Sequence, residues 1–256
     1  MNLITLIKNL VEGYKQFSIS SLPTKGYFYP KDFSMKIKKA KEEDIIEYEY
    51  KYDSDNVMEI VECVKRIVKK NTIFNDNYSF EDLKSVDIIF IFLEIVSYTT
   101  SKPIKIHFFN DQVRTSDFIE FNTKNFNYYN FESIKKFHNE SERVFEINGY
   151  KFSMPSVGVE NCLSQFLLSK SNQENAEEFT NYSYDFLFFL GWKNSLSFSE
   201  IENLITIFNF EIESSEKSKI KDVIDMFMAM IGYQLRHNDN LIDVKSNLDL
   251  EKIWKI

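Results

Sequence analysis

The sequence predicts an α+β fold that is predominantly helical, with a small antiparallel sheet in the middle third of its 256 residues. In the first and last thirds, apolar residues recur at every third or fourth position, which is the spacing of one helix face. In the middle third, apolar and polar residues alternate, and Asn148-Gly149 indicates the tight turn of a hairpin. Helices, then strands, then helices are typical of the α+β class. Since there is neither an internal repeat nor a low-complexity linker, we expect a single domain over residues 1–256.

Residues 1–17 predict an amphipathic helix that can detach from this domain. Its apolar residues lie three or four positions apart, and polar residues such as Lys8 and Glu12 fall on the other side. A stripe of this kind packs either on its own domain or on a partner. It consists of Leu3, Ile4, Ile7, Leu10, Val11, Tyr14 and Phe17.

Capping and breaking residues set the bounds of the other predicted elements. Ser79 precedes Asp82 by three residues, and Ser197 precedes Glu200 in the same way, so each serine predicts a helix start. Gly191 predicts a helix end. The helix over 80–99 is apolar nearly all round at its centre and is expected inside the fold. We expect helices over 42–50, 56–70, 80–99, 159–168, 180–190, 198–208 and 217–235, and strands over 33–37 and within 104–108, 117–127 and 145–152.

The charge of the chain argues against nucleic acid as its main partner. The formal net charge is −8 and the sequence pI is about 5.1, whereas a protein that binds phosphates usually gathers lysine and arginine on one face. Lys36, Lys38, Lys39 and Lys41 form a short basic cluster, but three acidic residues follow it directly. A local basic patch at this point stays open.

Neither membrane insertion nor a disulfide framework is expected. The most apolar internal stretches, 88–93 and 186–190, are far shorter than the roughly 20 residues of a membrane span. The N-terminus lacks the cleavage site of a secretory signal. Cys63 and Cys162 are the only cysteines, and both are expected to be reduced and buried. We therefore expect a soluble intracellular protein.

No catalytic, cofactor-binding or metal-binding residues are predicted. The three histidines, His107, His138 and His237, belong to no metal or catalytic motif, and the six glycines form no phosphate-binding loop. We therefore expect a protein that is not an enzyme. The enzymatic alternatives left open are a cysteine–histidine dyad and a hydrolase that uses His107 or His237.

One string is distinctive enough to suggest a family. Residues 22–30 read Leu-Pro-Thr-Lys-Gly-Tyr-Phe-Tyr-Pro, which resembles the "LPSKG…YP" signature of the T4-type tailed-phage baseplate hub and hub-assembly proteins. In that family a short strand, a charged "KEE" helix, and an aspartate before an apolar helix follow. Residues 35–38, residues 41–44 and Asp87 with the apolar run after it stand in those places here. The family's "R-SYG" ending is matched only by Ser97-Tyr98, because its arginine and glycine are absent. Met154-Pro155-Ser156 and the helix start at Ser197 resemble later landmarks of the family.

The resemblance implies a non-enzymatic role in building the hub of a contractile tail. We expect an assembly factor, or chaperone, that acts in the host cytoplasm by binding other hub proteins and has neither a nucleic acid nor a membrane as partner. The alternative is a structural subunit that is retained in the virion baseplate, and the oligomeric state is left open. The aromatic excess of 25 Phe and 14 Tyr suits protein binding. The residues expected to bind the partner are Leu3, Ile7, Leu10, Val11 and Tyr14 for docking and Tyr27, Phe28 and Tyr29 as anchors.

Overall fold

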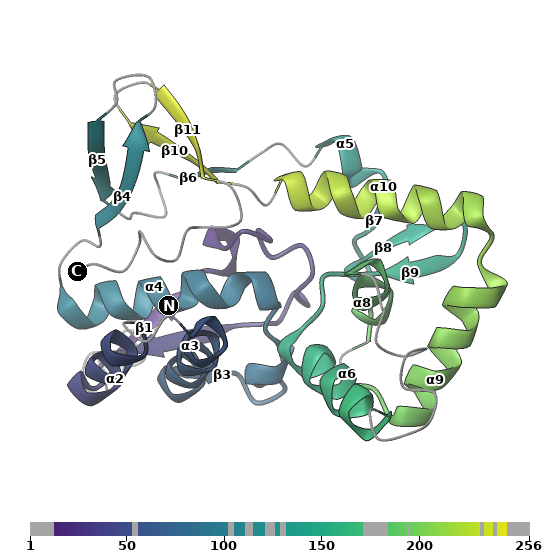
Figure 1. Cartoon of the computed structure of the whole chain (residues 1–256), viewed down its shortest axis with the longest axis horizontal. Coiled ribbons are helices and arrows are strands. Elements are labelled where there is room, and N and C mark those ends of the chain that lie inside the picture. Colours follow the sequence, from purple (N-terminus) through teal and green to yellow (C-terminus); the bar gives the residue numbers. More distant parts are fainter. Residues whose placement is uncertain are drawn as a thin grey trace.

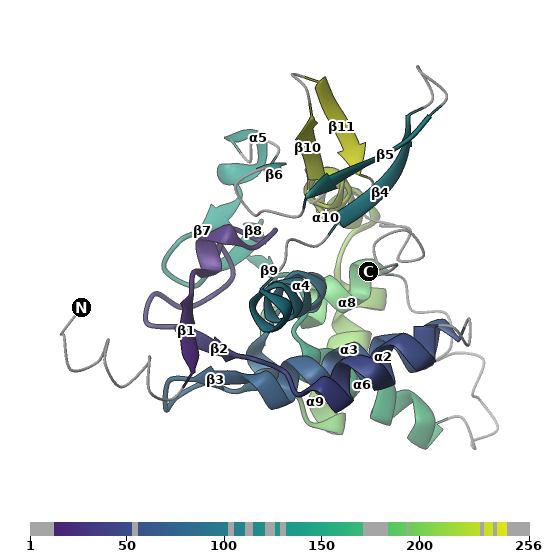
Figure 2. The same cartoon turned by 90° about the vertical axis from the view of Figure 1, so that its left-hand side faces the viewer.

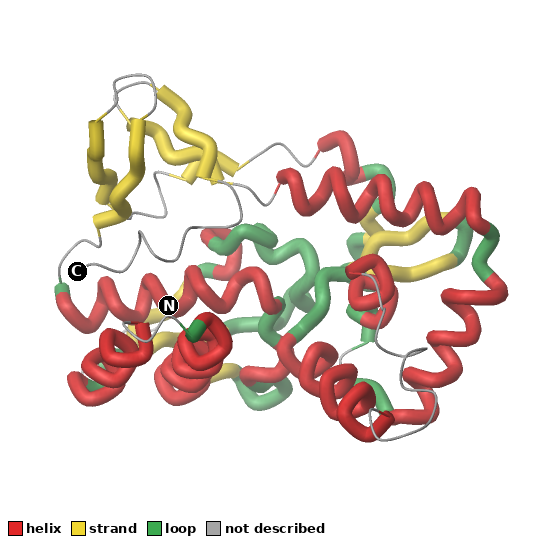
Figure 3. The backbone as a smooth tube through the Cα atoms, viewed as in Figure 1, coloured by secondary structure: helices red, strands yellow, loops and turns green. Residues whose placement is uncertain are grey.

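The computed structural model confirms a mostly helical α+β fold with antiparallel strands (Figures 1 and 3). It describes residues 13–52, 56–101, 105–110, 115–120, 126–128, 132–170, 184–193, 195–230, 233–237 and 240–244. The strands within these ranges form four separate small sheets, and only part of them belongs to the middle third.

The N-terminal part packs three helices with a three-stranded sheet. The strand order is β1-β2-β3, and Tyr14 in β1 lies opposite Lys38 in β2. Helix α4 is buried on nearly every side and is seen end-on between the other elements in Figure 2. Its position agrees with the prediction that the apolar helix lies inside the fold. The elements are β1 (Tyr14–Phe17), β2 (Met35–Lys38), α2 (Glu42–Tyr52), α3 (Val57–Asn71), β3 (Thr72–Phe74) and α4 (Ile88–Thr100).

The C-terminal part surrounds a second three-stranded sheet with helices. Asn148 and Gly149 have φ values of 50° and 85° and connect β8 to β9, as the sequence predicts. Ser197 caps α9 through the predicted capping box with Glu200. The elements are α5 (Glu132–Lys135), β7 (His138–Asn139), β8 (Val144–Ile147), β9 (Tyr150–Phe152), α6 (Val157–Lys170), α8 (Tyr184–Leu190), α9 (Phe198–Thr206), a π-helical turn (Ile207–Glu211) and α10 (Ser214–Met230).

The remaining strands lie together beside the helices (Figures 1 and 2). Strands β4 and β5 form a hairpin, and β6 pairs with β10, so residues 126–128 contact residues 233–235 across more than a hundred positions. These strands are β4 (Lys105–Asn110), β5 (Thr115–Glu120), β6 (Phe126–Tyr128), β10 (Tyr233–His237) and β11 (Asn240–Val244).

Two hydrophobic cores hold the described chain together. The first lies among α2, α3, α4 and β2, and the second among α6, α8, α9, α10 and β8. Each core takes one fully packed residue from the other side, since Val157 at the start of α6 is buried in the first and Phe28 is buried in the second. The prediction of a single domain stays a prediction.

Three element predictions are corrected. Residues Tyr14–Phe17 form a strand and not the end of a helix, because their backbone groups pair with β2. The helix expected over 80–99 begins only at Ile88, after two 3₁₀ turns at Phe80–Asp82 and Ser85–Asp87. The helix expected to reach residue 235 ends at Met230, and Leu235 lies in β10, where it pairs with Phe126 and Ile242. In the first and third cases strand pairing overrides a helical spacing of apolar residues. In the second case the backbone of residues 83–85 bonds to residues 155–157 in place of continuing a helix.

Gly191 ends α8 as predicted, but close packing is what requires a glycine there. A Cβ at this position would overlap the carbonyl oxygen of Ser153 and lie 3.0 Å from the nitrogen of Pro155. We expect Gly191→Ala to lower the free energy of unfolding by about 3 kcal/mol, since neither contact is a side chain that can move away. Urea unfolding measures this change. Gly149→Ala is the matched control: the space around Gly149 is open and only its left-handed backbone is strained. An equal or smaller cost at Gly191 would contradict the packing account.

Candidate functional site

The string of residues 22–30 fastens the two cores to each other. Leu22 and Tyr29 are buried in the first core, while Phe28, the immediate neighbour of Tyr29, is buried in the second. Consecutive turns make this reversal possible, with backbone N–H groups of Lys25 and Tyr27 donating to the carbonyls of Leu22 and Thr24 at 2.8 and 3.0 Å. Lys25 and Gly26 both have positive φ, at 50° and 76°.

Asp87 holds this string in place through hydrogen bonds. Its carboxylate accepts hydrogen bonds from the Thr24 backbone N–H at 3.2 Å, the Thr24 hydroxyl at 2.7 Å and the Tyr29 hydroxyl at 2.8 Å. The Tyr29 oxygen in turn accepts from the backbone N–H of Lys84 at 2.9 Å. Asp87 is fully buried at the residue before α4, so this network ties the string to the start of the central helix.

Burial changes the acid–base properties of the network. It raises the pKa of Asp87 to about 6, against the hydrogen bonds from Thr24 and Tyr29, which favour the charged form. Burial also lowers the pKa of Lys84 to about 8, although Asp87 acts in the opposite direction. The pKa of Tyr29 is raised well above its ordinary value by burial and by Asp87. Tyr29, Lys84 and Asp87 are thus the most strongly desolvated ionisable groups among the described residues. We call this network of Thr24, Tyr29, Lys84 and Asp87 the joint between the two cores.

Backbone hydrogen bonds place Lys84 between the two halves. Lys84 forms an isolated antiparallel bridge with Ser156. On either side of it, Ser85 N–H donates to the Pro155 carbonyl at 3.1 Å and Val157 N–H donates to the Leu83 carbonyl at 2.9 Å. The Lys84 side chain is therefore held at the seam, with only 4% of the residue exposed.

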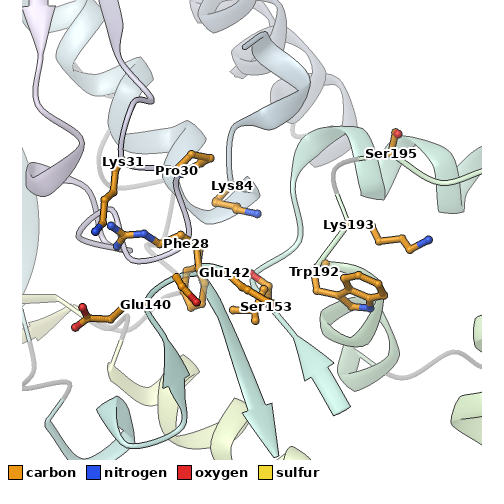
Figure 4. A pocket seen from close by; sticks show the side chains of 14 residues that line it. Phe28, Pro30, Lys31, Lys84, Glu140, Glu142, Ser153, Trp192, Lys193 and Ser195 are labelled. Carbon is orange, nitrogen blue, oxygen red and sulfur yellow. The ribbon is translucent and has the colours of Figure 1, made fainter. Parts of the chain in front are cut away.

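An open cleft of about 710 Å³ lies over this seam (Figure 4). In Figure 4 the Lys84 side chain extends into the cleft between Pro30 and Ser153, and Trp192 and Lys193 stand on the opposite side from Lys31. Four of the lining side chains are cationic and two are acidic. The charged lining residues are Lys31, Lys84, Glu140, Glu142, Arg143 and Lys193.

Ion pairs neutralise only some of these charges. Lys193 pairs with Glu200 at 2.6 Å, and Glu142 pairs with Lys151 at 2.5 Å. Within the part of the chain that the structure describes, no acidic group pairs with Lys31 or Arg143, and nothing accepts a hydrogen bond from the Lys84 ammonium. The cleft thus carries a local excess of positive charge in a chain whose net charge is −8.

The short basic cluster of the sequence lies elsewhere, on a second depression of about 420 Å³. Lys38, Lys39 and Lys41 line it together with Lys70, whose ammonium pairs with the buried Asp44 carboxylate at 2.7 Å. The local basic patch therefore exists, and the acidic Asp44 is among the residues that line it.

The predicted partner-binding residues have three different outcomes. Leu3, Ile7, Leu10 and Val11 lie outside the described residues. Tyr14 lies half-buried in β1, and Tyr27 is half-buried against His138, with ring centroids 5.2 Å apart. Phe28 and Tyr29 are 3% and 1% exposed. Their apolar surface is already used inside the chain, and their role as anchors for a partner stays a prediction.

His138, the histidine whose side chain the structure describes, is packed inside the fold. The ring of His138 is packed against Phe28 and Phe145, and its Nε2 lies 3.0 Å from the Tyr27 carbonyl oxygen. Burial lowers its pKa. The side chains of His107 and His237 are outside the description. The described residues contain no group of three potential metal ligands, and none of their helices is both long and apolar enough to cross a membrane.

Sequence reasoning missed the cleft residues. Lys84, Arg143 and Trp192 come from three segments far apart in the chain, and no motif connects them. The one available signal is Lys84 itself, a lysine between two apolar stretches and three residues before an aspartate.

The chain matches no protein-family model, and neither a curated protein nor a solved structure matches it.

Removal of the Tyr29 hydroxyl tests the network. Tyr29→Phe leaves the Lys84 N–H and one carboxylate oxygen of Asp87 with fewer partners in a buried place, so we expect a loss of about 1–3 kcal/mol in the free energy of unfolding. Tyr78→Phe is the control, because the Tyr78 hydroxyl also donates to an aspartate, Asp32, but at the surface. Chemical unfolding should show the larger loss for Tyr29→Phe, and equal losses would refute the network as the joint's main constraint.

The pKa of Asp87 predicts a pH dependence of stability. Its folded value of about 6 lies above the ordinary value near ~4, so this group's stabilising contribution is complete below about pH 4 and is lost as the pH rises through about 6. Relative to Asp87→Asn, the wild type should lose about 2–3 kcal/mol between pH 4 and pH 7. Urea unfolding at several pH values measures both profiles, and parallel profiles would contradict the prediction.

Proposed function

We propose that the chain is a non-enzymatic assembly factor for the baseplate hub of a contractile-tailed phage. It acts in the host cytoplasm by binding other hub proteins. The residues that resemble the family supply the identity in this proposal, and the arrangement of those residues in the fold supports it.

The observation that carries the proposal is the contact between the two main family-like landmarks. The string of residues 22–30 and Asp87 are about sixty positions apart, yet Thr24 and Tyr29 make three hydrogen bonds to the Asp87 carboxylate. The threonine stands where the family string has a serine, and both side chains carry the hydroxyl that such a bond needs. Two resemblances that form one buried unit support a common structural origin better than two separate turns do.

An accessible apolar surface supports the assembly role. Ile46 and Tyr50 are one helical turn apart on α2 and are 57% and 73% exposed, and Met58 at the start of α3 is 71% exposed. The ion pair between Lys51 and Glu59 holds these two helix ends next to each other. Exposed apolar surface is typical of protein-binding sites, and these three side chains stand on helices that contact each other. We call these three residues the α2–α3 patch.

The α2–α3 patch offers exposed side chains for docking, whereas the predicted anchors Phe28 and Tyr29 are buried. Tyr and Met are suited to docking, since tyrosine combines a large apolar ring with a hydroxyl and methionine adapts its shape to a partner. The alternative role, a subunit retained in the baseplate, requires the same surface to be buried permanently in a larger interface.

The proposal predicts where the protein is found during infection. We expect it in lysates of infected cells, bound to hub proteins, and absent from purified virions, as measured by quantitative mass spectrometry of both samples. Presence in virions at a stoichiometric level would replace the assembly factor by the structural subunit. Absence of every tail protein from its complexes would overturn both roles.

A second measurement identifies the surface. Ile46→Glu with Tyr50→Glu should reduce hub-protein recovery with the tagged chain at least about tenfold, because two charges in an apolar contact remove most of its binding energy. Phe210→Glu is the matched control, because Phe210 is 82% exposed on the other half of the fold. Equal losses in the two variants would show that the α2–α3 patch is not the docking surface.

A further inference from the structure

The Lys84 side chain is buried, with 4% of the residue exposed, and its ammonium reaches the cleft without a hydrogen bond or ion pair to any described residue. Asp87 and Asp82 act on it through their charges, but the Asp87 oxygens already accept three hydrogen bonds from Thr24 and Tyr29. Among the described residues no other group bonds to the ammonium. A lysine that is this deeply buried ordinarily has an anionic or carbonyl partner, because an isolated buried charge is costly.

The surroundings of Lys84 favour a negatively charged partner. Lys31 and Arg143 line the same cleft and have no acidic partner among the described residues. Of the two lining acids, Glu142 is neutralised by Lys151, so Glu140 alone opposes the three cations. Arg143 is held in a left-handed conformation, with φ of 60°, which fixes where its side chain starts. Three cations from separate segments, 31, 84 and 143, therefore converge on one space.

The remaining lining suits an organic ligand better than a bare inorganic ion. Pro30 and Trp192 contribute apolar surface beside the cations, and the indole ring of Trp192 already has the Lys193 ammonium 5.2 Å from its centroid. A volume of about 710 Å³ is within the usual range for sites that hold a small molecule or a few residues of a peptide. An inorganic phosphate would fill only a small part of it.

We infer that this cleft binds a short acidic segment of a partner protein, with one side-chain carboxylate on the Lys84 ammonium and a second near Arg143 and Lys31. The apolar side chains between the acids lie against Trp192 and Pro30. The inference rests on the proposed protein-binding function and names a second contact surface, separate from the α2–α3 patch. Because the cleft spans the seam between the two cores, an occupied cleft also links the two halves by contacts to Lys84 and Trp192.

Fluorescence of Trp192 gives a direct measurement. In a Trp254→Phe background Trp192 is the only tryptophan, so its emission reports the cleft. The probe is an acetylated and amidated hexapeptide of alternating glutamate and leucine, in which only side-chain carboxylates are charged. We expect a saturable change in emission that weakens as salt is added, and no change with the glutamine counterpart of the peptide. Inorganic phosphate, titrated alone, is the competing source of negative charge.

Variants separate the Lys84 site from general charge. Lys84→Met should weaken peptide binding at least tenfold, while Lys219→Met, an exposed position on α10, should leave it unchanged. Arg143→Gln, at the more accessible side of the cleft, should weaken binding about threefold to tenfold and serves as the test if Lys84→Met does not fold, as judged by circular dichroism. Equal weakening by Lys219→Met, saturation by phosphate without peptide binding, or no response to either probe would each overturn the inference.

The result is distinguishable from a failure of the proposed function. If hub proteins co-purify with the chain but the peptide does not bind, the assembly role stands and the proposed cleft site is wrong. If the peptide binds in a Lys84-dependent way but no hub protein is recovered with the chain, the cleft site stands and the assembly role is wrong.

Discussion

The arrangement of the two cores depends on one buried carboxylate. Asp87 holds the string of residues 22–30 through Thr24 and Tyr29, and the string places neighbouring aromatic side chains, Phe28 and Tyr29, into different cores. A charged group in this position is costly to desolvate, which raises its pKa, but its hydrogen bonds are directional. Apolar contacts alone would stabilise the joint without fixing the path of the chain through it.

The seam between the cores also holds the buried ionisable groups and the charged cleft. Backbone bonds between residues 83–85 and 155–157 bring Lys84 to the seam, and the open cleft lies over it. The features that stabilise the joint and those proposed to bind a partner thus share one segment, Lys84 to Asp87. A ligand on Lys84 would act next to the network that connects the halves.

The two proposed contact surfaces have different physical characters. The α2–α3 patch is apolar and exposed, so its contribution to binding comes from surface removed from water. The cleft is cationic and partly enclosed, so its contribution is specificity and orientation.

The sequence by itself determined the helical α+β class, the caps at Ser79 and Ser197, the hairpin turn at Asn148 and the interior place of α4, because each depends on neighbours within a few residues. It also contained the string and Asp87, but not the bond between them. Only the tertiary structure decided that Tyr14–Phe17 is a strand and that Phe28 and Tyr29 are buried. It alone assembled the cleft around Lys84, since strand pairing, burial and the convergence of cations depend on residues far apart in the chain.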